Sequence, residues 1–300
     1  MVSEEDHIVL DTLIRTSKPA KGVSHPFLDL IWRPWTSVWL SLPPSFRLRT
    51  YWHLCWLGIK LYGRTATFIQ RLPFGLYLKR ERMDTLTRTA FGNIYVAMNT
   101  TIPVPTVLDV VADGMNSLMI MTSLPGTDLR DSIRNGEISE ESFEETMRDW
   151  FTQLRNLTPP DPNRVCSIDD GPCRSFRVTP DPFGPFPDVA SFHEKILRTC
   201  PISEWERLEK IVPQSYNKEH RVVFSHGDLH ISNILVHNGR LSGLIDWECA
   251  GWYPEYWDYT IAIYHIKKLP FWVNSLGRIF PQYAQELEVE RVMWKVICPW

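Results

Sequence analysis

Three short apolar runs lie close together between residues 221 and 246, and a polar stretch lies between the first two of them. The runs are RVVFSH, NILV and LSGLID, and the turn sequence HNGR separates the last two. This pattern predicts three short strands, of which the last two form a hairpin. The polar stretch SHGDLHISN then lies on the loop between the first two strands. Loops held by strands are a common place for binding and catalytic side chains.

The polar residues of this region have a spacing that suits phosphoryl transfer. Asp228 and Asn233 are five residues apart, and Asn233 and Asp246 are thirteen apart across the predicted hairpin. Phosphoryl transfer needs a carboxylate that orients the attacking hydroxyl and accepts its proton. It also needs an amide oxygen and a second carboxylate to hold Mg²⁺ against the phosphates.

The strings HGDLHISN and GLIDWE resemble the catalytic loop and the metal-binding segment of protein-kinase-like phosphotransferases, in particular the aminoglycoside phosphotransferase and choline kinase group. LPFGLYLKR, IPVP, SLPG and AGWYPEYWDY also resemble segments of this group, so the resemblance runs from about residue 57 to 267. It implies an α+β, two-lobe protein-kinase-like fold. Such a fold has a small antiparallel-sheet N-lobe and a mostly helical C-lobe.

The resemblance also implies roles for single residues. Asp228 matches the catalytic base, and His226 matches the residue that braces its loop. Asn233 and Asp246 match the metal ligands. Lys79 matches the lysine that pairs with the nucleotide phosphates.

The remaining nucleotide contacts follow from the same resemblance. Met121, Ser123 and Leu124 lie in the connector whose backbone groups would meet adenine, and the phosphates would lie under the turn around Gly63. The implied reaction transfers the γ-phosphate of ATP, with Mg²⁺, to a hydroxyl of a small molecule. The acceptor itself is not readable from the sequence.

One departure from the family pattern concerns the partner of Lys79. A glutamate on the helix after the third strand normally holds this lysine, and Thr89 lies near the expected position. No acidic residue lies between Thr85 and Asn99, and Glu81 is an alternative on the wrong element. The absence favours a second hypothesis, in which the chain is a kinase-like pseudoenzyme that binds a nucleotide or a protein.

Two further interpretations concern the motif and the residues after it. His226, Asp228 and His230 form an HxDxH pattern, which is typical of a zinc or di-metal hydrolase. Aromatic and acidic residues follow the motif at Glu248, Trp252, Glu255, Trp257 and Asp258. They would suit a cationic or sugar-like acceptor, or they could equally be core and cap residues.

The N-terminal half reads as strands around one helix. Strands are expected at 57–62, 65–72, 74–80, 106–111 and 117–122, giving a five-stranded sheet. The helix is expected over 83–99 with Asp84 as its cap. We expect an extension at 1–50, an N-lobe at 51–123 and a C-lobe at 124–300.

The C-terminal half reads as helices separated by proline-rich loops. The strongest helix covers 139–157, with Ser139 as its cap. Residues 158–188 contain too much proline and glycine for regular structure. Further helices are expected at 189–199, 202–212, 255–267 and 283–297.

Composition limits the location and the partners. The formal net charge is −3, which gives no overall electrostatic reason to expect nucleic acid or an anionic membrane as the main partner. The start of the chain does not resemble an export signal, which favours the cytoplasm. The apolar run at 28–44 is interrupted by Arg33 and Pro34 and is too short for a transmembrane segment. We expect it to pack on the body, or else to contact a membrane surface or a partner.

The remaining features constrain less. The six cysteines contain no CxxC pair, so reduced thiols are expected, with a Cys166–Cys173 bond as the alternative. No feature predicts an oligomeric state.

Overall fold

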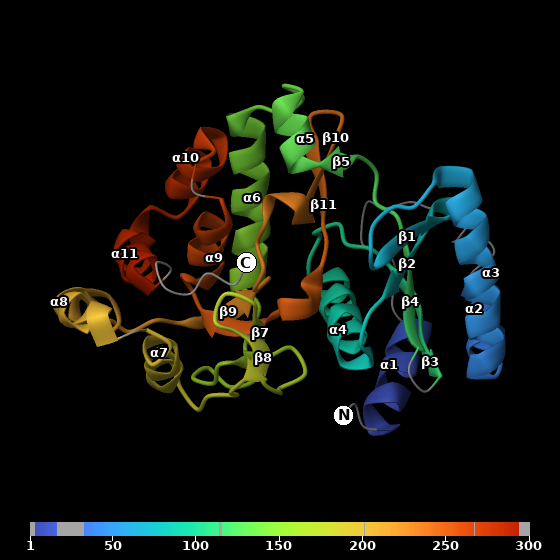
Figure 1. Cartoon of the computed structure of the whole chain (residues 1–300), viewed down its shortest axis with the longest axis horizontal. Coiled ribbons are helices and arrows are strands. Elements are labelled where there is room, and N and C mark those ends of the chain that lie inside the picture. Colours follow the sequence, from blue (N-terminus) through green and yellow to red (C-terminus); the bar gives the residue numbers. More distant parts are fainter. Residues whose placement is uncertain (1–3, 17–32, 114–115, 201, 267, 294–300) are drawn as a thin grey trace. The chain divides into compact units, whose positions relative to one another are not determined.

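A computed structural model describes residues 4–16, 33–113, 116–200, 202–266 and 268–293 (Figure 1). The chain divides into two compact units. The first contains Met1–Pro125 and Gly243–Glu248, and the second contains Gly126–Ser242 and Cys249–Trp300. The short segment Gly243–Glu248 therefore belongs to the first unit, although second-unit residues flank it on both sides.

The first unit is built on an antiparallel sheet with the strand order β1-β2-β4-β3. Its strands are β1 (Ile69–Leu72), β2 (Leu76–Arg80), β3 (Val107–Asp113) and β4 (Asn116–Thr122). Helix α3 (Pro44–Tyr62) packs Leu48 and Tyr51 against one face of the sheet. The other face is covered by α1 (Glu4–Thr16) and α4 (Met83–Asn99), and α2 (Arg33–Leu40) precedes α3 (Figure 1).

The strand predicted over 57–62 is wrong, because these residues form the last turns of α3. The sheet of the described first unit therefore has four strands and not five. The buried residues of α3 recur at helical spacing, as in Leu48, Tyr51 and Gly58. A Cβ atom on Gly58 would lie 2.2 Å from the carbonyl oxygen of Arg71, so glycine allows the helix to approach β1 closely.

The predicted helix over 83–99 and the hairpin after it are confirmed by α4 and by the β3–β4 pair. The predicted cap is wrong. The N-cap residue is Arg82, which makes no side-chain capping hydrogen bond, and Asp84 lies in the first turn. There the Asp84 carboxylate is 3.2 Å from Nε of Arg82.

A buried polar cluster joins α2 and α3 to the sheet. The Asp109 carboxylate on β3 is fully buried and accepts hydrogen bonds from Arg47 (2.5 Å), Tyr51 (2.7 Å) and Trp39 (3.2 Å). Of the tryptophan-rich segment 28–44, residues 28–32 lie outside the described residues. Trp39 packs against the sheet as expected, whereas Trp35 is exposed.

The second unit is mostly helical. Its first long helix, α6 (Glu140–Arg155), confirms the prediction at 139–157, and the Ser139 side chain caps it by accepting a hydrogen bond from the Ser142 N–H. The other helices are α5 (Leu129–Arg134), α7 (Val189–Leu197), α8 (Trp205–Ser215), α9 (Trp257–His265), α10 (Pro270–Ile279) and α11 (Ala284–Met293).

Short strands complete this unit in three small sheets. Their orders are β11-β10-β5, β6-β12-β9 and β7-β8. The strands are β5 (Thr127–Asp128), β6 (Cys166–Ser167), β7 (Cys173–Ser175), β8 (Thr179–Phe183), β9 (Val222–Ser225), β10 (Ile234–His237), β11 (Arg240–Leu244) and β12 (Gly251–Pro254). Strands β9, β10 and β11 confirm the three predicted apolar strands.

Two expectations for the second unit need correction. Residues 158–188 are not wholly irregular, because β6, β7 and β8 form there. Helix α10 was not predicted; its first turn holds a proline, which suits the start of a helix. The helices expected near 189, 202, 255 and 283 are present with shifted ends, and residues 294–297 of the last lie outside the described residues.

Two further features bear on the sequence expectations. In the described residues, no helix is long and apolar enough to span a membrane. Cys166 and Cys173 are free thiols, so the alternative disulfide is wrong.

Candidate active site

Lys79, Asp246 and Glu248 form a charged cluster in the first unit, called here the lysine cluster. Lys79 lies on β2, and its Nζ atom is 2.6 Å from Oδ1 of Asp246 and 3.1 Å from Oε2 of Glu248. The Lys79 side chain is 6% exposed, whereas that of Asp246 is 35% exposed. The lysine is therefore held inside the unit, and one of its carboxylate partners still faces solvent.

The charge of Lys79 is maintained by its neighbours. Burial acts to lower the pKa of the ammonium group, but the carboxylates of Asp246 and Glu248 outweigh it and raise the pKa above its ordinary value. Lys79 is thus a permanent cation at neutral pH.

The partner of Lys79 differs from the expectation. The Thr89 hydroxyl on α4 donates to the carbonyl oxygen of Thr85, which satisfies it within the helix. Glu81 lies beyond the end of β2, and the hydrogen-bond partners of Lys79 are Asp246 and Glu248. Glu248 was missed as a lysine partner because it comes from a segment far away in the sequence.

The segment Gly243–Glu248 is fixed within the first unit by several contacts. The N–H of Leu244 donates to the carbonyl oxygen of Pro103 (3.0 Å), which lies in the predicted IPVP turn. The buried Trp247 indole donates to the Leu244 carbonyl (3.0 Å). Asp246 adopts φ +68°, a left-handed conformation that aspartate tolerates better than most residues. These contacts place the Asp246 carboxylate beside Lys79.

The loop His226–Asn233, called here the HGD loop, lies in the second unit between β9 and β10 and is held by Asp258. The Asp258 carboxylate accepts hydrogen bonds from the backbone N–H groups of His226 (3.1 Å) and Gly227 (2.9 Å). Burial raises the pKa of Asp258 above its ordinary value, against the opposing effects of His226 and these N–H donors. The Asp258 side chain is buried and positions the loop.

Gly227 is required by the shape of this loop. It adopts φ +79°, and a Cβ atom there would lie 2.1 Å from the carbonyl oxygen of Cys249. Both the conformation and the close approach exclude larger residues.

The predicted residues of the HGD loop contact one another. Nδ1 of the buried His226 accepts the N–H of Asp228 (3.3 Å). The Asn233 amide nitrogen donates to the Asp228 backbone oxygen (3.0 Å) and lies 3.4 Å from its carboxylate. This arrangement commits the nitrogen of Asn233 and leaves its Oδ1 as the atom suited to a cation.

The HxDxH interpretation is not supported by the structure. The ring of His230 caps the following turn through Ser232, whose N–H donates to Nδ1 (3.2 Å). Within the described residues, no three histidine, cysteine, aspartate or glutamate side chains are grouped to hold a metal.

Trp252 and Trp257, for which the sequence left an acceptor role and a core role open, belong to the core. Trp252 and Trp257 are both buried, and Trp257 stacks on Tyr253 at 5.4 Å between ring centroids. Glu255 lies 3.3 Å from Arg221.

The other predicted nucleotide contacts lie in the first unit. The N–H of Ser123 donates to the carbonyl oxygen of Gly75 (2.7 Å), so this N–H is used within the unit. Met121 lies on β4, and the Leu124 side chain packs beside Gly243. Gly63 ends α3 with φ +75° and does not lie in a turn between two strands, so the argument that placed phosphates there is lost.

The residues predicted for the site thus form two groups, one within each unit. A family model described as the phosphotransferase enzyme family, APH, matches residues 75–289. The chain belongs to this family. The matched range includes both the lysine cluster and the HGD loop.

Solved structures share the fold of this phosphotransferase. A thermostable mutant of aminoglycoside phosphotransferase APH(4)-Ia, in ternary complex with ADP and hygromycin B, is 13% identical with a TM-score of 0.57, covering 81% of this chain and 88% of that chain. The GDP and kanamycin complex of APH(2")-IIia is 10% identical with a TM-score of 0.52, covering 82% and 88%. APH(3'')-Id from Streptomyces rimosus ATCC10970 is 16% identical with a TM-score of 0.50, covering 76% and 88%. These likenesses confirm the α+β kinase-like fold.

Proposed function

We propose that this phosphotransferase moves the γ-phosphate of ATP to a hydroxyl group of a small molecule. The observation that carries the proposal is that one family match, over residues 75–289, contains Lys79, Asp228, Asn233 and Asp246 at the expected spacing. ADP and GDP are bound in the solved relatives, so ATP and GTP are both candidate donors. The hydroxyl-bearing acceptors of those relatives include hygromycin B and kanamycin.

Asp228 acts in this proposal as the base. Its carboxylate accepts the proton of the acceptor hydroxyl as the hydroxyl oxygen forms a bond to the γ-phosphorus, while the bond from that phosphorus to the β-phosphate oxygen breaks and ADP leaves. The hydrogen bonds from the Asn233 amide and around His226 support the carboxylate in the required orientation.

Lys79 pairs with the phosphates of the donor. Glu248 replaces the missing helix glutamate as the residue that orients Lys79. This pairing supports an active enzyme over an inactive kinase-like module. The nucleotide base would contact the connector through the backbone groups of Met121 and Leu124 and the carbonyl of Ser123. The Ser123 N–H is not a candidate, because it already donates to Gly75.

Asn233 and Asp246 are the proposed magnesium ligands. The donor set fits, because Oδ1 of Asn233 and the partly exposed carboxylate of Asp246 are both hard oxygen ligands. Bound Mg²⁺ would neutralise charge on the phosphates. The proposed location is the cytoplasm, where ATP is available.

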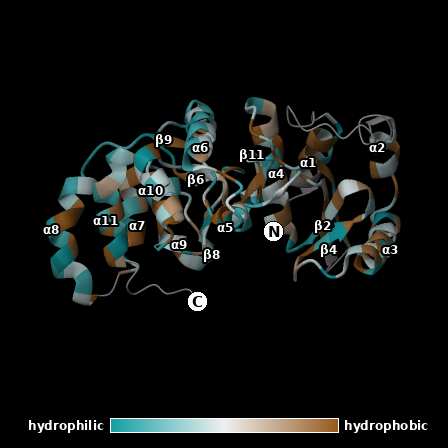
Figure 2. Ribbon diagram, turned by 90° about the horizontal axis from the view of Figure 1, so that it is seen from above, coloured by the Kyte–Doolittle hydropathy of each residue, from teal (hydrophilic) through white to brown (hydrophobic). Residues whose placement is uncertain are grey.

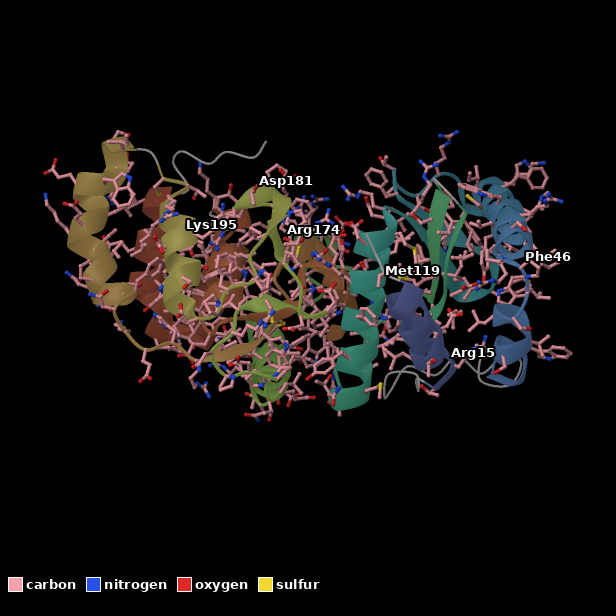
Figure 3. All side chains as sticks on the ribbon, turned by 90° about the horizontal axis from the view of Figure 1, so that it is seen from below. Arg15, Phe46, Met119, Arg174, Asp181 and Lys195 are labelled. Carbon is pink, nitrogen blue, oxygen red and sulfur yellow. The ribbon has the colours of Figure 1, made fainter. Side chains whose placement is uncertain are left out.

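Calorimetry tests the donor site. We expect ATP to bind the wild type more tightly with Mg²⁺ than without it, and Asp246→Asn to lose this difference. Asp228→Asn should keep Mg²⁺-dependent binding but lose at least about a hundredfold in turnover against a panel of hydroxyl-bearing acceptors. Asp181→Asn, at an exposed position of the second unit, is the matched control and should change neither (Figure 3).

The outcomes separate the two hypotheses. Binding without turnover on any acceptor would favour the non-catalytic module. Failure of ATP and GTP to bind the folded wild type would contradict the donor site altogether.

A further inference from the structure

One stretch of the first unit is strongly basic. Residues 30–80 contain no aspartate or glutamate and eight basic residues, although the whole chain has a formal net charge of −3. Arg47 and Lys79 are paired with carboxylates in the interior. The exposed basic side chains are Arg49, Lys60, Arg64, Arg71 and Arg80. The surface of the first unit formed by these residues therefore carries excess positive charge, although the net charge of the whole chain is slightly negative.

Helix α3 adds aromatic side chains to this surface. Trp52 and Trp56 are one turn apart and exposed, and Trp56 is 57% exposed. Nζ of Lys60 lies 3.8 Å above the Trp56 ring. Phe46, at the start of the helix, points away from the unit (Figure 3). Helix α3 carries both apolar and polar residues (Figure 2). Exposed tryptophans beside basic residues are typical of helices that lie in the headgroup layer of a membrane.

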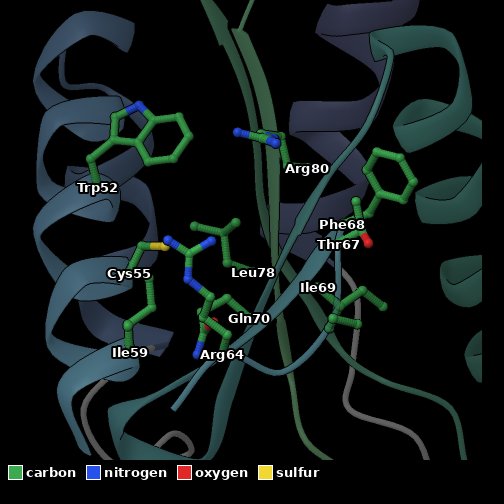
Figure 4. Close-up of a pocket in the computed structure, with 11 residues that line it drawn as sticks. Trp52, Cys55, Ile59, Arg64, Thr67, Phe68, Ile69, Gln70, Leu78 and Arg80 are labelled. Carbon is green, nitrogen blue, oxygen red and sulfur yellow. The ribbon is translucent and has the colours of Figure 1, made fainter. Parts of the chain in front are cut away.

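A pocket of about 200 Å³ lies beside this helix (Figure 4). Its walls come from α3, β1, β2 and the loop between α3 and β1, and they include Arg64 and Arg80 but no acidic residue. Neither guanidinium has an ion pair or hydrogen bond with the described residues. Figure 4 shows that the Arg64 side chain extends toward Cys55 and Leu78. The volume is below the roughly 300–1,000 Å³ typical of pockets for whole ligands, so it suits a headgroup.

The pocket is separate from the lysine cluster. Leu78 and Arg80 alternate with Lys79 on β2, and Leu78 packs into the core under α3. Because successive strand residues point to opposite faces, Lys79 faces away from this pocket.

We propose that the exposed face of α3 and this pocket dock on an anionic phospholipid membrane. Arg64 and Arg80 receive the phosphate of a headgroup, while Trp52 and Trp56 enter the interfacial layer. Arg64 and Arg80, which form no ion pair with the described residues, supply the charge complementarity, and each cation near an anionic bilayer surface strengthens partitioning about fivefold. An acidic soluble protein would satisfy the arginines, but it would not require exposed indole rings beside them.

Vesicle co-sedimentation of the full chain tests the proposal. We expect the wild type to pellet with vesicles of phosphatidylcholine mixed with phosphatidylserine and to stay in the supernatant with phosphatidylcholine alone. Arg64→Gln combined with Arg80→Gln should reduce the bound fraction at least tenfold. Trp56→Ala should reduce it severalfold, because the exposed indole contributes interfacial burial and no core packing.

Matched variants in the second unit show whether binding depends on the face of α3 or only on the total charge and hydrophobicity of the chain. Arg130→Gln combined with Arg207→Gln removes the same charge from exposed positions, and Trp205→Ala removes another exposed indole. Both should pellet as the wild type does. Thermal unfolding of every variant establishes that it is folded.

Several outcomes would overturn the proposal. These are no pelleting with the anionic vesicles, equal pelleting with both vesicle types, or equal losses in the matched variants. Glycerol 3-phosphate distinguishes the other source of phosphate. If it binds the wild type but not the Arg64/Arg80 double variant, and vesicles do not bind, the pocket is a soluble-anion site and the membrane proposal is wrong.

Discussion

Lys79 in the first unit and His226 in the second are both buried polar residues of the proposed site, but their surroundings differ. Lys79 is held by two carboxylate side chains, whereas the backbone at His226 is held by one buried carboxylate that accepts its N–H group. The first arrangement depends on charge and can exchange a carboxylate for a phosphate. The second depends on backbone geometry and has no equivalent substitute. The contrast indicates that the lysine cluster adapts to a ligand and the HGD loop keeps one shape.

The largest expected effect comes from removing the support of the HGD loop. Asp258→Ala leaves two backbone N–H groups without their acceptor, at about 1–3 kcal/mol each, so we expect a loss of about 4 kcal/mol in the free energy of unfolding. Urea unfolding measures it. Asp258→Asn, which keeps one oxygen acceptor, should lose less. A loss below about 1 kcal/mol in the alanine variant would show that backbone support is unimportant.

Gly227 in the HGD loop and Gly63 in the first unit have similar φ angles but different surroundings, so they compare the two units directly. Gly227→Ala should lose about 3 kcal/mol of unfolding free energy, because the methyl group meets the Cys249 carbonyl in addition to the strained conformation. Gly63→Ala carries only the conformational cost, about 2 kcal/mol at φ +75° and ψ −178°, since no atom lies within 4 Å of its Cβ position. Thermal unfolding of both variants measures the difference, and equal losses would contradict the close approach at Gly227.

Acid should lower the free energy of unfolding of the second unit, because this unit buries a neutral histidine, His193. Burial, and secondarily the charge of His220, lower the pKa of His193 to about 3. In the unfolded chain the His193 imidazole binds a proton near pH 6.5, whereas in the folded chain it stays neutral down to about pH 3. The contribution of neutral His193 to the free energy of unfolding is therefore complete above pH 6.5 and falls as the pH decreases, by up to about 1.4 kcal/mol per pH unit. Unfolding at pH 7, 6 and 5 measures it. His193→Phe should show a shallower decline, and parallel curves would exclude this histidine.

The smallest effect is expected at the lysine cluster. Glu248→Gln leaves Lys79 paired with Asp246 alone, so its long side chain is less ordered, and we expect about fivefold weaker binding of ATP with Mg²⁺. Glu81→Gln is the control because the Glu81 carboxylate is not among the hydrogen-bond partners of Lys79. Calorimetry compares them. A larger effect at Glu81 would show that the original sequence expectation was better.

The parts of the fold and of the site that could be predicted are those that depend on residues close together in the sequence. Helix α4 was predictable because Leu86, Ala90 and Ile94 repeat every four positions and form its buried face. The spacing of Asp228, Asn233 and Asp246 was readable directly from the sequence. Glu248 and Asp258 were not assigned their observed contacts because each acts on a partner distant in the sequence. The error at 57–62 has another cause. LGIKLY favours a strand by composition, but it continues a helix whose register is set upstream by Leu48 and Tyr51.

The membership of Gly243–Glu248 in the first unit has a consequence for synthesis on the ribosome. A growing chain completes residues 1–125 long before it reaches Asp246, and all of 126–242 is made in between. During that interval Lys79 has no counter-ion from its final cluster, and the Pro103 carbonyl lacks the N–H of Leu244. The first unit therefore matures only after most of the second has emerged. Domains of a nascent chain otherwise tend to fold one after another from the N-terminus.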